Sequence, residues 1–234
     1  MALPKIKHPT YKVTIPSTKQ EVTMRPFTVQ EEKLLLMAKS TEKNEDILLT
    51  IKQVIQNCII EPVDVEKLAT FDVEYLFIKL RAKSIGEFVD LEYTDEDTNE
   101  VYKFQVNLDQ IEVNFNPAHT NKISISDEIG LVLKYPTLEE IKLLESGQSD
   151  EENVFKILLK CVDKIYDKET VYSDYTDKDL EDFLNSLPMD SMGKIKEFFE
   201  TMPVVEHTVK IPIKKGKGVS NKEVVLRGIN SFFT

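Results

Sequence analysis

The same order of sequence patterns occurs twice along the chain, and this repetition constrains the fold more than any other feature. In each half, alternating apolar and polar residues around a short polar turn predict a β-hairpin. Stretches with helical apolar spacing follow, and a second alternating strand pair closes the half. The sequence therefore predicts an α+β fold with two tandem, diverged repeats, 1–117 and 118–234, each made of a β-hairpin, about three helices and a β-hairpin.

Each predicted first helix begins with the same capping pattern. Thr28 is followed three residues later by Glu31, and Thr137 is followed by Glu140, in both cases at the start of an apolar run. In a capping box, the threonine hydroxyl accepts a hydrogen bond from a backbone amide of the first turn, and the acidic side chain accepts one from the threonine amide. The two motifs predict two helix starts. A single capping box is common, so the inference of repetition depends on the neighbouring elements.

The neighbouring elements recur in the same order, with increasing divergence. In the first half we expect hairpin segments 11–16 and 21–25, helices 46–60 and 71–82, and strands 88–93 and 101–106. In the second half we expect a hairpin over 121–134, helices 153–162, 177–187 and 191–200, and strands 206–213 and 223–226. The third helix of the second half is split, because Pro188 inside a helix would remove a backbone hydrogen bond.

Charge and hydropathy exclude several classes of protein. The net charge is −11, from 41 acidic and 30 basic residues, so a general nucleic-acid-binding protein with a basic face is not expected. An acidic mimic of nucleic acid remains an alternative, which would need carboxylates spaced along one face. No apolar run approaches the roughly 18 residues of a membrane span. The first nine residues are too polar and proline-rich for a signal peptide, so we expect the protein to stay in the cytoplasm where it is made.

We predict no catalytic, cofactor-binding or metal-binding residues. The sequence contains neither G-x-x-x-x-G-K-[ST] nor G-x-G-x-x-G, so no phosphate-binding loop and no small-molecule substrate are indicated. The three histidines, His8, His119 and His207, have no nearby metal-ligand partner in the sequence. Cys58 and Cys161 lie in apolar helical stretches and are expected to be buried thiols rather than a disulfide. The chain is therefore not expected to be an enzyme.

Two groups of residues are candidates for contacts with a partner. Lys214, Lys215 and Lys217 form the one basic cluster, which we expect at a hairpin tip and which could dock an acidic partner. Phe232 and Phe233 stand in an apolar C-terminal segment, which we expect to pack rather than to remain free. The segment could close the core of the second repeat, as 108–113 does in the first, or insert into a partner.

Several segments resemble one protein family. Residues 25–38 (RPFTVQEEKLLLMA) are similar to the opening helix of baseplate hub proteins from T-even-type contractile-tailed phages. Segments 4–18, 72–87 and 224–233 also resemble that family, so the similarity covers nearly the whole chain. The resemblance implies a structural component of the baseplate hub region, present in the virion tail and contacting other baseplate and tail proteins during tail assembly. The alternative is a hub assembly chaperone that is absent from the mature virion.

The chain departs from the family at the hairpin tips. In that family the closing hairpins can carry C-x-x-C knuckles suggestive of zinc. The matching turns here read TDED at 94–97 and KKGK at 214–217, without cysteine. A zinc ion is therefore not expected, and ordinary hairpin pairing is expected to hold these tips.

Overall fold

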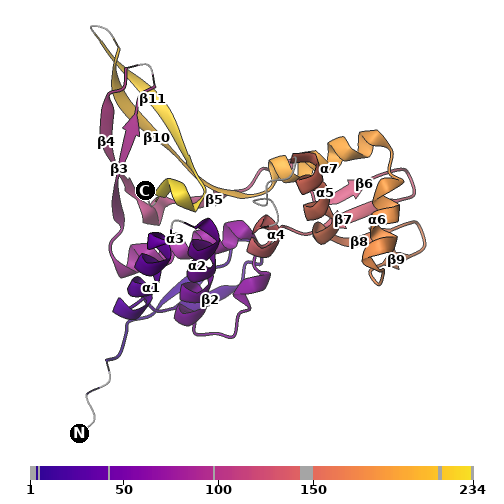
Figure 1. Ribbon diagram of the computed structural model, residues 1–234, viewed down its shortest axis with the longest axis horizontal. Helices are drawn as coiled ribbons and strands as arrows, with labels where there is room; N and C mark the ends of the chain where they lie inside the picture. The colour runs from indigo at the N-terminus through magenta and orange to yellow at the C-terminus, as the bar shows by residue number, and fades with distance from the viewer. Residues whose placement is uncertain are drawn as a thin grey trace. The chain divides into compact units, whose positions relative to one another are not determined.

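The computed structural model describes Pro4 and residues 6–41, 43–96, 98–142, 150–215 and 218–232 (Figure 1). Hairpins and groups of helices alternate along the chain, and the predicted α+β fold class is confirmed. Contacts within the chain define two compact units. The first unit contains the described residues up to Asn114 and those from Val204 onward, and the second contains Phe115–Pro203.

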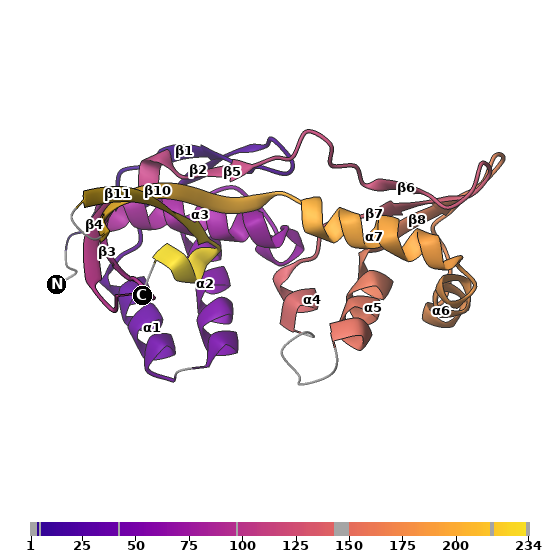
Figure 2. The same cartoon turned by 90° about the horizontal axis from the view of Figure 1, so that it is seen from above.

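The N-terminal part of the first unit joins a hairpin to three helices (Figure 2). The elements are β1 (Tyr11–Thr14), β2 (Glu21–Met24), α1 (Val29–Ser40), α2 (Asn44–Cys58), the 3-10 helix η1 (Val65–Lys67) and α3 (Thr70–Ser84). The hairpin turn is held against α3, because the buried Asp72 carboxylate accepts from the Ser17 amide at 2.9 Å and from its hydroxyl at 2.5 Å. Alternation in β2 buries Val22 and Met24 and leaves Glu21 exposed, as its apolar spacing predicts.

The three helices differ in how much of their surface is covered. The central helix, α3, is the most buried of the three, and its buried residues are Phe71, Asp72, Val73, Leu76, Phe77, Ile78, Leu80 and Ala82. Tyr75, Lys79 and Lys83 are spaced at i, i+4 and i+8, and they form a side of α3 that stays partly or fully exposed. Helix α2 instead buries one stripe that includes Ile51, Val54, Ile55 and Cys58. Helix α1 buries only Glu31 and Ala38, so most of its apolar residues are partly or fully exposed.

Two hairpins complete the first unit. The elements are β3 (Phe88–Thr94), β4 (Val101–Asn107), the 3-10 helix η2 (Leu108–Gln110), β5 (Glu112–Asn114), β10 (Val204–Lys215), β11 (Gly218–Arg227) and the 3-10 helix η4 (Ile229–Phe232). The antiparallel sheet order is β11-β10-β5, and β3 pairs with β4. Strand pairing extends from Glu206↔Arg227 to Lys215↔Gly218, so strands continue through most of the stretch 214–221 that the sequence suggested was a loop.

The final hairpin lies with the first unit, whereas the sequence assigned it to the repeat 118–234. Residues 204–206 of β10 pair with β5, and Val205 and Leu226 are buried there. The physical reason is that β5 offers an unpaired strand edge and an apolar surface that the alternating residues of β10 can cover. The compact units therefore divide the chain differently from the predicted boundary between 117 and 118.

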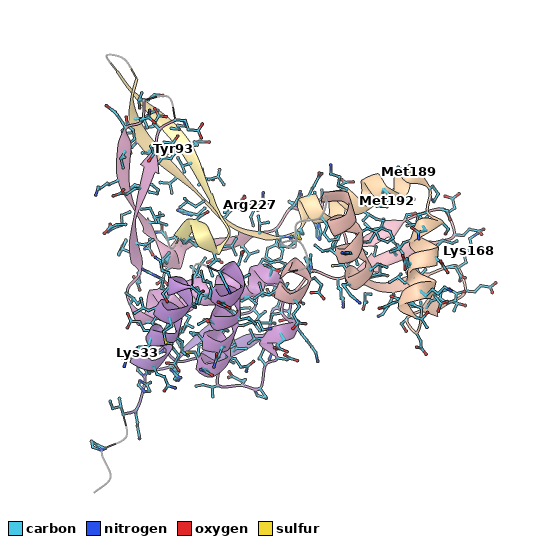
Figure 3. All side chains as sticks on the ribbon, viewed as in Figure 1. Lys33, Tyr93, Lys168, Met189, Met192 and Arg227 are labelled. Atoms are coloured by element: carbon cyan, nitrogen blue, oxygen red, sulfur yellow. The ribbon has the colours of Figure 1, made fainter. Side chains whose placement is uncertain are left out.

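A charged contact joins the two hairpins of the first unit near the β3–β4 turn. The Lys222 ammonium lies 3.2 Å from the Asp95 carboxylate and 5.2 Å from the centre of the Tyr93 ring. Tyr93 is labelled on β3 in Figure 3. The Thr98 hydroxyl also donates to Asp95, whose side chain is only 3% exposed. The β3–β4 turn is thus held by an ion pair and a hydroxyl in addition to the strand pairing that the sequence predicted.

The second unit packs helices on a small antiparallel sheet. Its strands are β6 (Lys122–Ser124), β7 (Gly130–Leu133), β8 (Val162–Tyr166) and β9 (Val171–Tyr172), paired in that order. Its helices are α4 (Leu138–Lys142), α5 (Asp150–Cys161), α6 (Asp177–Asn185) and α7 (Met189–Thr201). The break between α6 and α7 falls at Pro188, as predicted. Strands β8 and β9 were not predicted from the sequence, and Val162 begins a strand instead of ending a helix.

Candidate interaction surface

The structure separates the residues that the sequence suggested as partner contacts. Lys214 and Lys215 lie at the end of β10, opposite Val219 and Gly218. Lys217 and Phe233 lie outside the described residues, as do the side chains of the first two lysines. Phe232 is completely buried in the first unit, so the C-terminal segment packs there and not in the core of the second unit.

The exposed surface of α1 is the most unusual apolar feature of the first unit. Residues 34–37 are Leu-Leu-Leu-Met, four consecutive apolar residues in one helix. Successive helical residues are about 100° apart, so a run of four covers most of the circumference and cannot face one core. Leu34 and Leu35 are half-buried, while Leu36 and Met37 are 62% and 67% exposed. This part of α1 therefore has more apolar surface than its own unit covers.

These exposed residues belong to one continuous stripe. Val29, Lys33, Leu36 and Met37 are spaced at i, i+4, i+7 and i+8, which places them on the same face of α1. Val29 is 66% exposed and Lys33 is also exposed. Figure 3 labels Lys33 on the outer side of the helix. We call these four residues the α1 stripe.

A groove adjoins the α1 stripe and shares Leu36 with it. The groove has a volume of about 380 Å³ and is lined by Phe27, Leu35, Leu36, Lys39, Ile47, Ile51, Phe77, Arg81, Ile85, Val89, Ile229 and Phe232. All of these residues belong to the first unit. Ile85, which lines the groove, and Phe88, which precedes the lining residue Val89, are more than half exposed. Exposed apolar surface of this kind marks sites of protein or ligand contact more often than isolated apolar residues do.

The charged residues that line the groove are both cations. Lys39 is exposed near the end of α1, and Arg81 extends from α3. Burial lowers the pKa of Arg81 from its usual value, because a charged guanidinium loses hydration inside the groove wall. Among the described lining residues there is no carboxylate. The groove is therefore apolar with a local positive charge, on a chain whose net charge is −11.

The C-terminal wall of the groove is fixed by the carboxyl group of the partly buried Glu74. Gly228 takes a left-handed conformation with φ of 68°, and its amide donates to the Val205 carbonyl at 3.1 Å. The next amide, from Ile229, donates to the Glu74 carboxyl at 3.4 Å. Burial raises the pKa of Glu74 to about 7, and the hydrogen bond from Ile229 offsets part of that rise. This contact positions η4, which supplies Ile229 and Phe232 to the groove.

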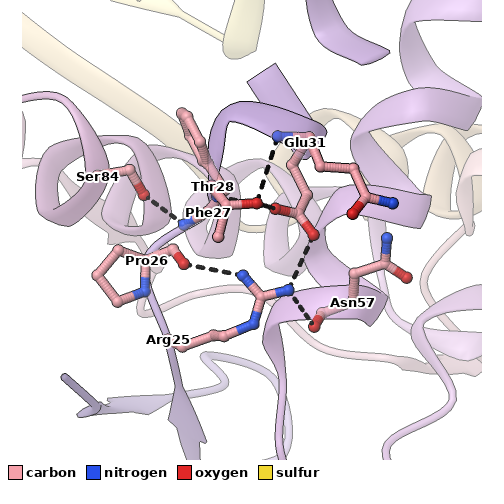
Figure 4. Close-up of polar contacts among 8 residues, drawn as sticks. Arg25, Pro26, Phe27, Thr28, Glu31, Asn57 and Ser84 are labelled. Atoms are coloured by element: carbon pink, nitrogen blue, oxygen red, sulfur yellow. Dashed lines mark hydrogen bonds and ion pairs between the residues drawn. The ribbon is translucent and has the colours of Figure 1, made fainter. Parts of the chain in front are cut away.

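The start of α1 is fixed by a network of hydrogen bonds (Figure 4). The Glu31 carboxylate accepts from the Thr28 amide at 2.8 Å and from an Arg25 guanidinium nitrogen at 2.8 Å. The same nitrogen of Arg25 donates to the Asn57 carbonyl at the end of α2. Burial alone would raise the pKa of Glu31, but the hydrogen bonds from Arg25 and Thr28 outweigh it and lower the pKa to about 2. The predicted capping box is confirmed, and it joins α1 to α2.

The two cysteines are buried away from the groove lining. Burial raises the pKa of Cys58 to about 11 and that of Cys161 to about 12, so both thiols stay protonated at neutral pH. No cluster of three or more metal-ligating side chains occurs among the described residues. No helix within the described ranges is long and apolar enough to cross a membrane.

The apolar run 34–37 is a sequence signal for the α1 stripe as well as for a helix. Four consecutive apolar residues are more than one buried helix face can accommodate, so the run by itself predicts that some of them stay exposed. The groove had no such signal. Its lining comes from residues 27–89 and from the C-terminal Ile229 and Phe232, which only the tertiary structure brings together.

Of the comparisons with known proteins, the one with protein families gives a match. No curated protein and no solved structure gives a significant match to the chain. A family model described as T4 bacteriophage base plate protein matches residues 8–234, which is nearly the whole chain and includes both compact units. The chain therefore belongs to the family of T4 bacteriophage base plate proteins.

Proposed function

We propose that the protein is a structural component of the hub region of a contractile phage tail baseplate, and that it acts through protein–protein contacts in tail assembly. Membership of the family makes the chain a phage baseplate protein that contacts other tail proteins. The hub position is supported by the resemblance of residues 25–38 to the opening helix of hub proteins. The observation that carries a role in contact is the exposed α1 stripe beside the apolar groove.

The physical argument for contact rests on the cost of exposed apolar surface. Burying apolar surface contributes roughly 25 cal/mol per Å² of favourable free energy. A partner that covers the exposed stripe and groove would therefore gain binding free energy from them. The groove offers neither a paired acid and base nor a metal-binding set among its described lining residues. Its composition therefore supports binding rather than catalysis.

Mass spectrometry of purified phage particles tests this proposal. Peptides of this chain should be present in an amount proportional to other baseplate proteins, and they should remain after salt washing. A tag imaged by electron microscopy should lie near the tail axis rather than at the baseplate periphery. A particle that lacks the protein would contradict a structural role, and a peripheral tag would contradict the hub position.

An assembly chaperone remains the second candidate function. The exposed apolar stripe also suits a factor that covers a partner during assembly and then leaves. Such a factor would co-purify with assembly intermediates and be missing from finished particles. The same mass spectrometry, applied to both samples, separates the two functions.

We also propose that the repeats 1–117 and 118–234 arose from one duplicated α+β unit. Two pairs of equivalent hydrogen bonds support this. The Arg25 amide donates to the Cys58 carbonyl at 2.9 Å, and the Lys134 amide donates to the Cys161 carbonyl at 2.7 Å. The capping carboxylates of Glu31 and Glu140 accept from the threonine amides at 2.8 and 2.7 Å. An experimental structure in which residues 11–58 and 122–161 do not superpose in the same order would contradict common ancestry.

A further inference from the structure

We propose that the groove and the α1 stripe together bind an acidic amphipathic helix of a partner baseplate protein. This inference rests on the proposed function, because it names the partner chemistry of the same surface. The apolar face of the partner helix would cover Leu36, Met37 and the groove. Carboxylates beside that face would meet Lys33, Lys39 and Arg81.

The shape of the exposed surface favours a helix as the occupant. The α1 stripe follows helical spacing over 29–37, and α1 itself has 12 residues, a length of about 18 Å. Helices bind in apolar grooves through side chains at i, i+3 or i+4, and i+7, a pattern that an adjacent helix can interleave. The groove is also bordered by α2 and α3, so the arriving helix would pack against existing helices.

Local charge selects an acidic occupant. Lys39 and Arg81 line the groove, and Lys33 lies within the α1 stripe, so each cation adjoins apolar surface that the partner would cover. A carboxylate placed beside an arginine in a partly desolvated groove forms a charge-assisted hydrogen bond, which is stronger than one between neutral groups. A basic helix would instead bring like charges together, which is unfavourable.

A second copy of this chain is a poorer occupant. Each copy has a net charge of −11, so self-association would bring two acidic molecules together. The local positive charge of the groove is thus better matched by a different protein with an acidic helix. The identity of the occupant is decided by cross-linking, as described below.

The first experiment uses a pair of designed helical peptides and the full-length protein. Each peptide has about 18 residues, because shorter isolated helices are marginal in water. Leucine occupies i, i+3, i+4 and i+7, and the flanking positions are all glutamate in one peptide and all lysine in its twin. Fluorescence anisotropy measures both affinities. We expect the acidic peptide to bind at least tenfold more tightly than the basic twin.

Three variants connect that binding to the proposed surface. Leu36→Asp should weaken binding of the acidic peptide at least tenfold, because covering a leucine contributes a factor of about 10 to 100 in affinity. Lys39→Glu should reduce or reverse the preference for the acidic twin. Met189→Asp is the matched control, because Met189 is an exposed apolar residue of the second unit, and it should leave binding unchanged. Circular dichroism checks that each variant is folded.

Equal binding of the two peptides would overturn the inference. So would equal effects of Leu36→Asp and Met189→Asp, because an apolar peptide would then be adhering without using the groove. A variant that has lost its helical signal is replaced by Met37→Asp, which alters the same stripe one residue further on. If the folded variant, Leu36→Asp or its replacement Met37→Asp, does not weaken binding, the proposal is rejected.

The second experiment identifies the natural occupant in assembling tails. A photo-reactive phenylalanine derivative replaces Leu36, or Met189 as control, in cells that produce phage particles. We expect position 36 to cross-link to a partner segment with helical apolar spacing and an acidic residue within one turn. A cross-link to a second copy, a partner segment without carboxylates, or no cross-link from position 36 would overturn the inference.

The cross-links also separate this inference from the proposed function. If position 36 cross-links to an acidic helix in assembly intermediates but finished particles lack the protein, the structural role fails and the groove inference stands. If finished particles contain the protein but position 36 gives no cross-link, the structural role stands and the groove inference fails.

Discussion

Replacing the partly buried Glu74 with glutamine should stabilise the first unit in a pH-dependent way. The Glu74 carboxyl accepts from the Ile229 amide and holds the C-terminal segment against α3. Burial raises its pKa from 4.5 to about 7, so ionising Glu74 in the folded chain costs about 3 kcal/mol more than ionising it in the unfolded chain. Glutamine keeps the shape and the acceptor oxygen but never ionises.

The direction of the effect follows from the two protonation equilibria. The unfolded carboxyl loses its proton near pH 4.5 and the folded one near pH 7. The stability that the protonated Glu74 contributes is therefore fully present below pH 4.5 and is lost as the pH rises through 7. Glu74→Gln should resemble the wild type at pH 4.5 and be more stable by about 3 kcal/mol at pH 8.5.

Urea unfolding followed by circular dichroism measures this difference, since the chain has no tryptophan to report by fluorescence. Amide hydrogen exchange over residues 228–232 locates the effect at the C-terminal segment. Glu181→Gln, an exposed position of the second unit, serves as the control. A gain that does not depend on pH, or a loss of stability at pH 8.5, would refute the reasoning about Glu74.

Three further changes have expected outcomes that urea unfolding can measure. Gly130→Ala should cost about 1–3 kcal/mol, because the added carbon would lie 2.3 Å from the Tyr166 ring; unchanged stability would contradict this close contact. Glu31→Ala should cost about 2–4 kcal/mol, because Arg25 and the first turn of α1 lose their acceptor; a loss below 0.5 kcal/mol would argue against the network. Burial lowers the pKa of His119, so the stability that neutral His119 contributes should fall as the pH falls through 6.5, the usual pKa of histidine. His119→Phe should remove that part of the pH dependence. Identical stability-against-pH profiles for the variant and the wild type would contradict this prediction.

Local patterns in the sequence were sufficient to predict most elements. The capping box of Thr28 and Glu31, the strand alternation over 88–106 and the helix break at Pro188 all occur in the structure. Each depends on residues only a few positions apart, so hydrogen bonding and backbone geometry within the segment determine the outcome. The α+β class follows from the order of these segments.

Longer-range features were decided by the tertiary structure. The strands β8 and β9 were not predicted, because their few residues become strands only when β8 pairs with β7 and β9 pairs with β8. The last hairpin lies in the first unit because β5 pairs with β10 there, and nothing in residues 204–227 indicates which edge they meet. Phe232 follows this hairpin and is buried in the first unit, although the apolar C-terminal sequence also allowed contact with a partner.

The candidate surface combines both kinds of information. The run 34–37 by itself determined that α1 has more apolar residues than one helix face can bury. Only the tertiary structure decided which residues of that run stay exposed. It also decided that α3 and the C-terminal Ile229 and Phe232 complete the apolar groove beside them, with Lys39 and Arg81 in its lining. The reason is physical: helical periodicity is a property of neighbouring residues, whereas a groove is made by contacts between segments far apart in the chain.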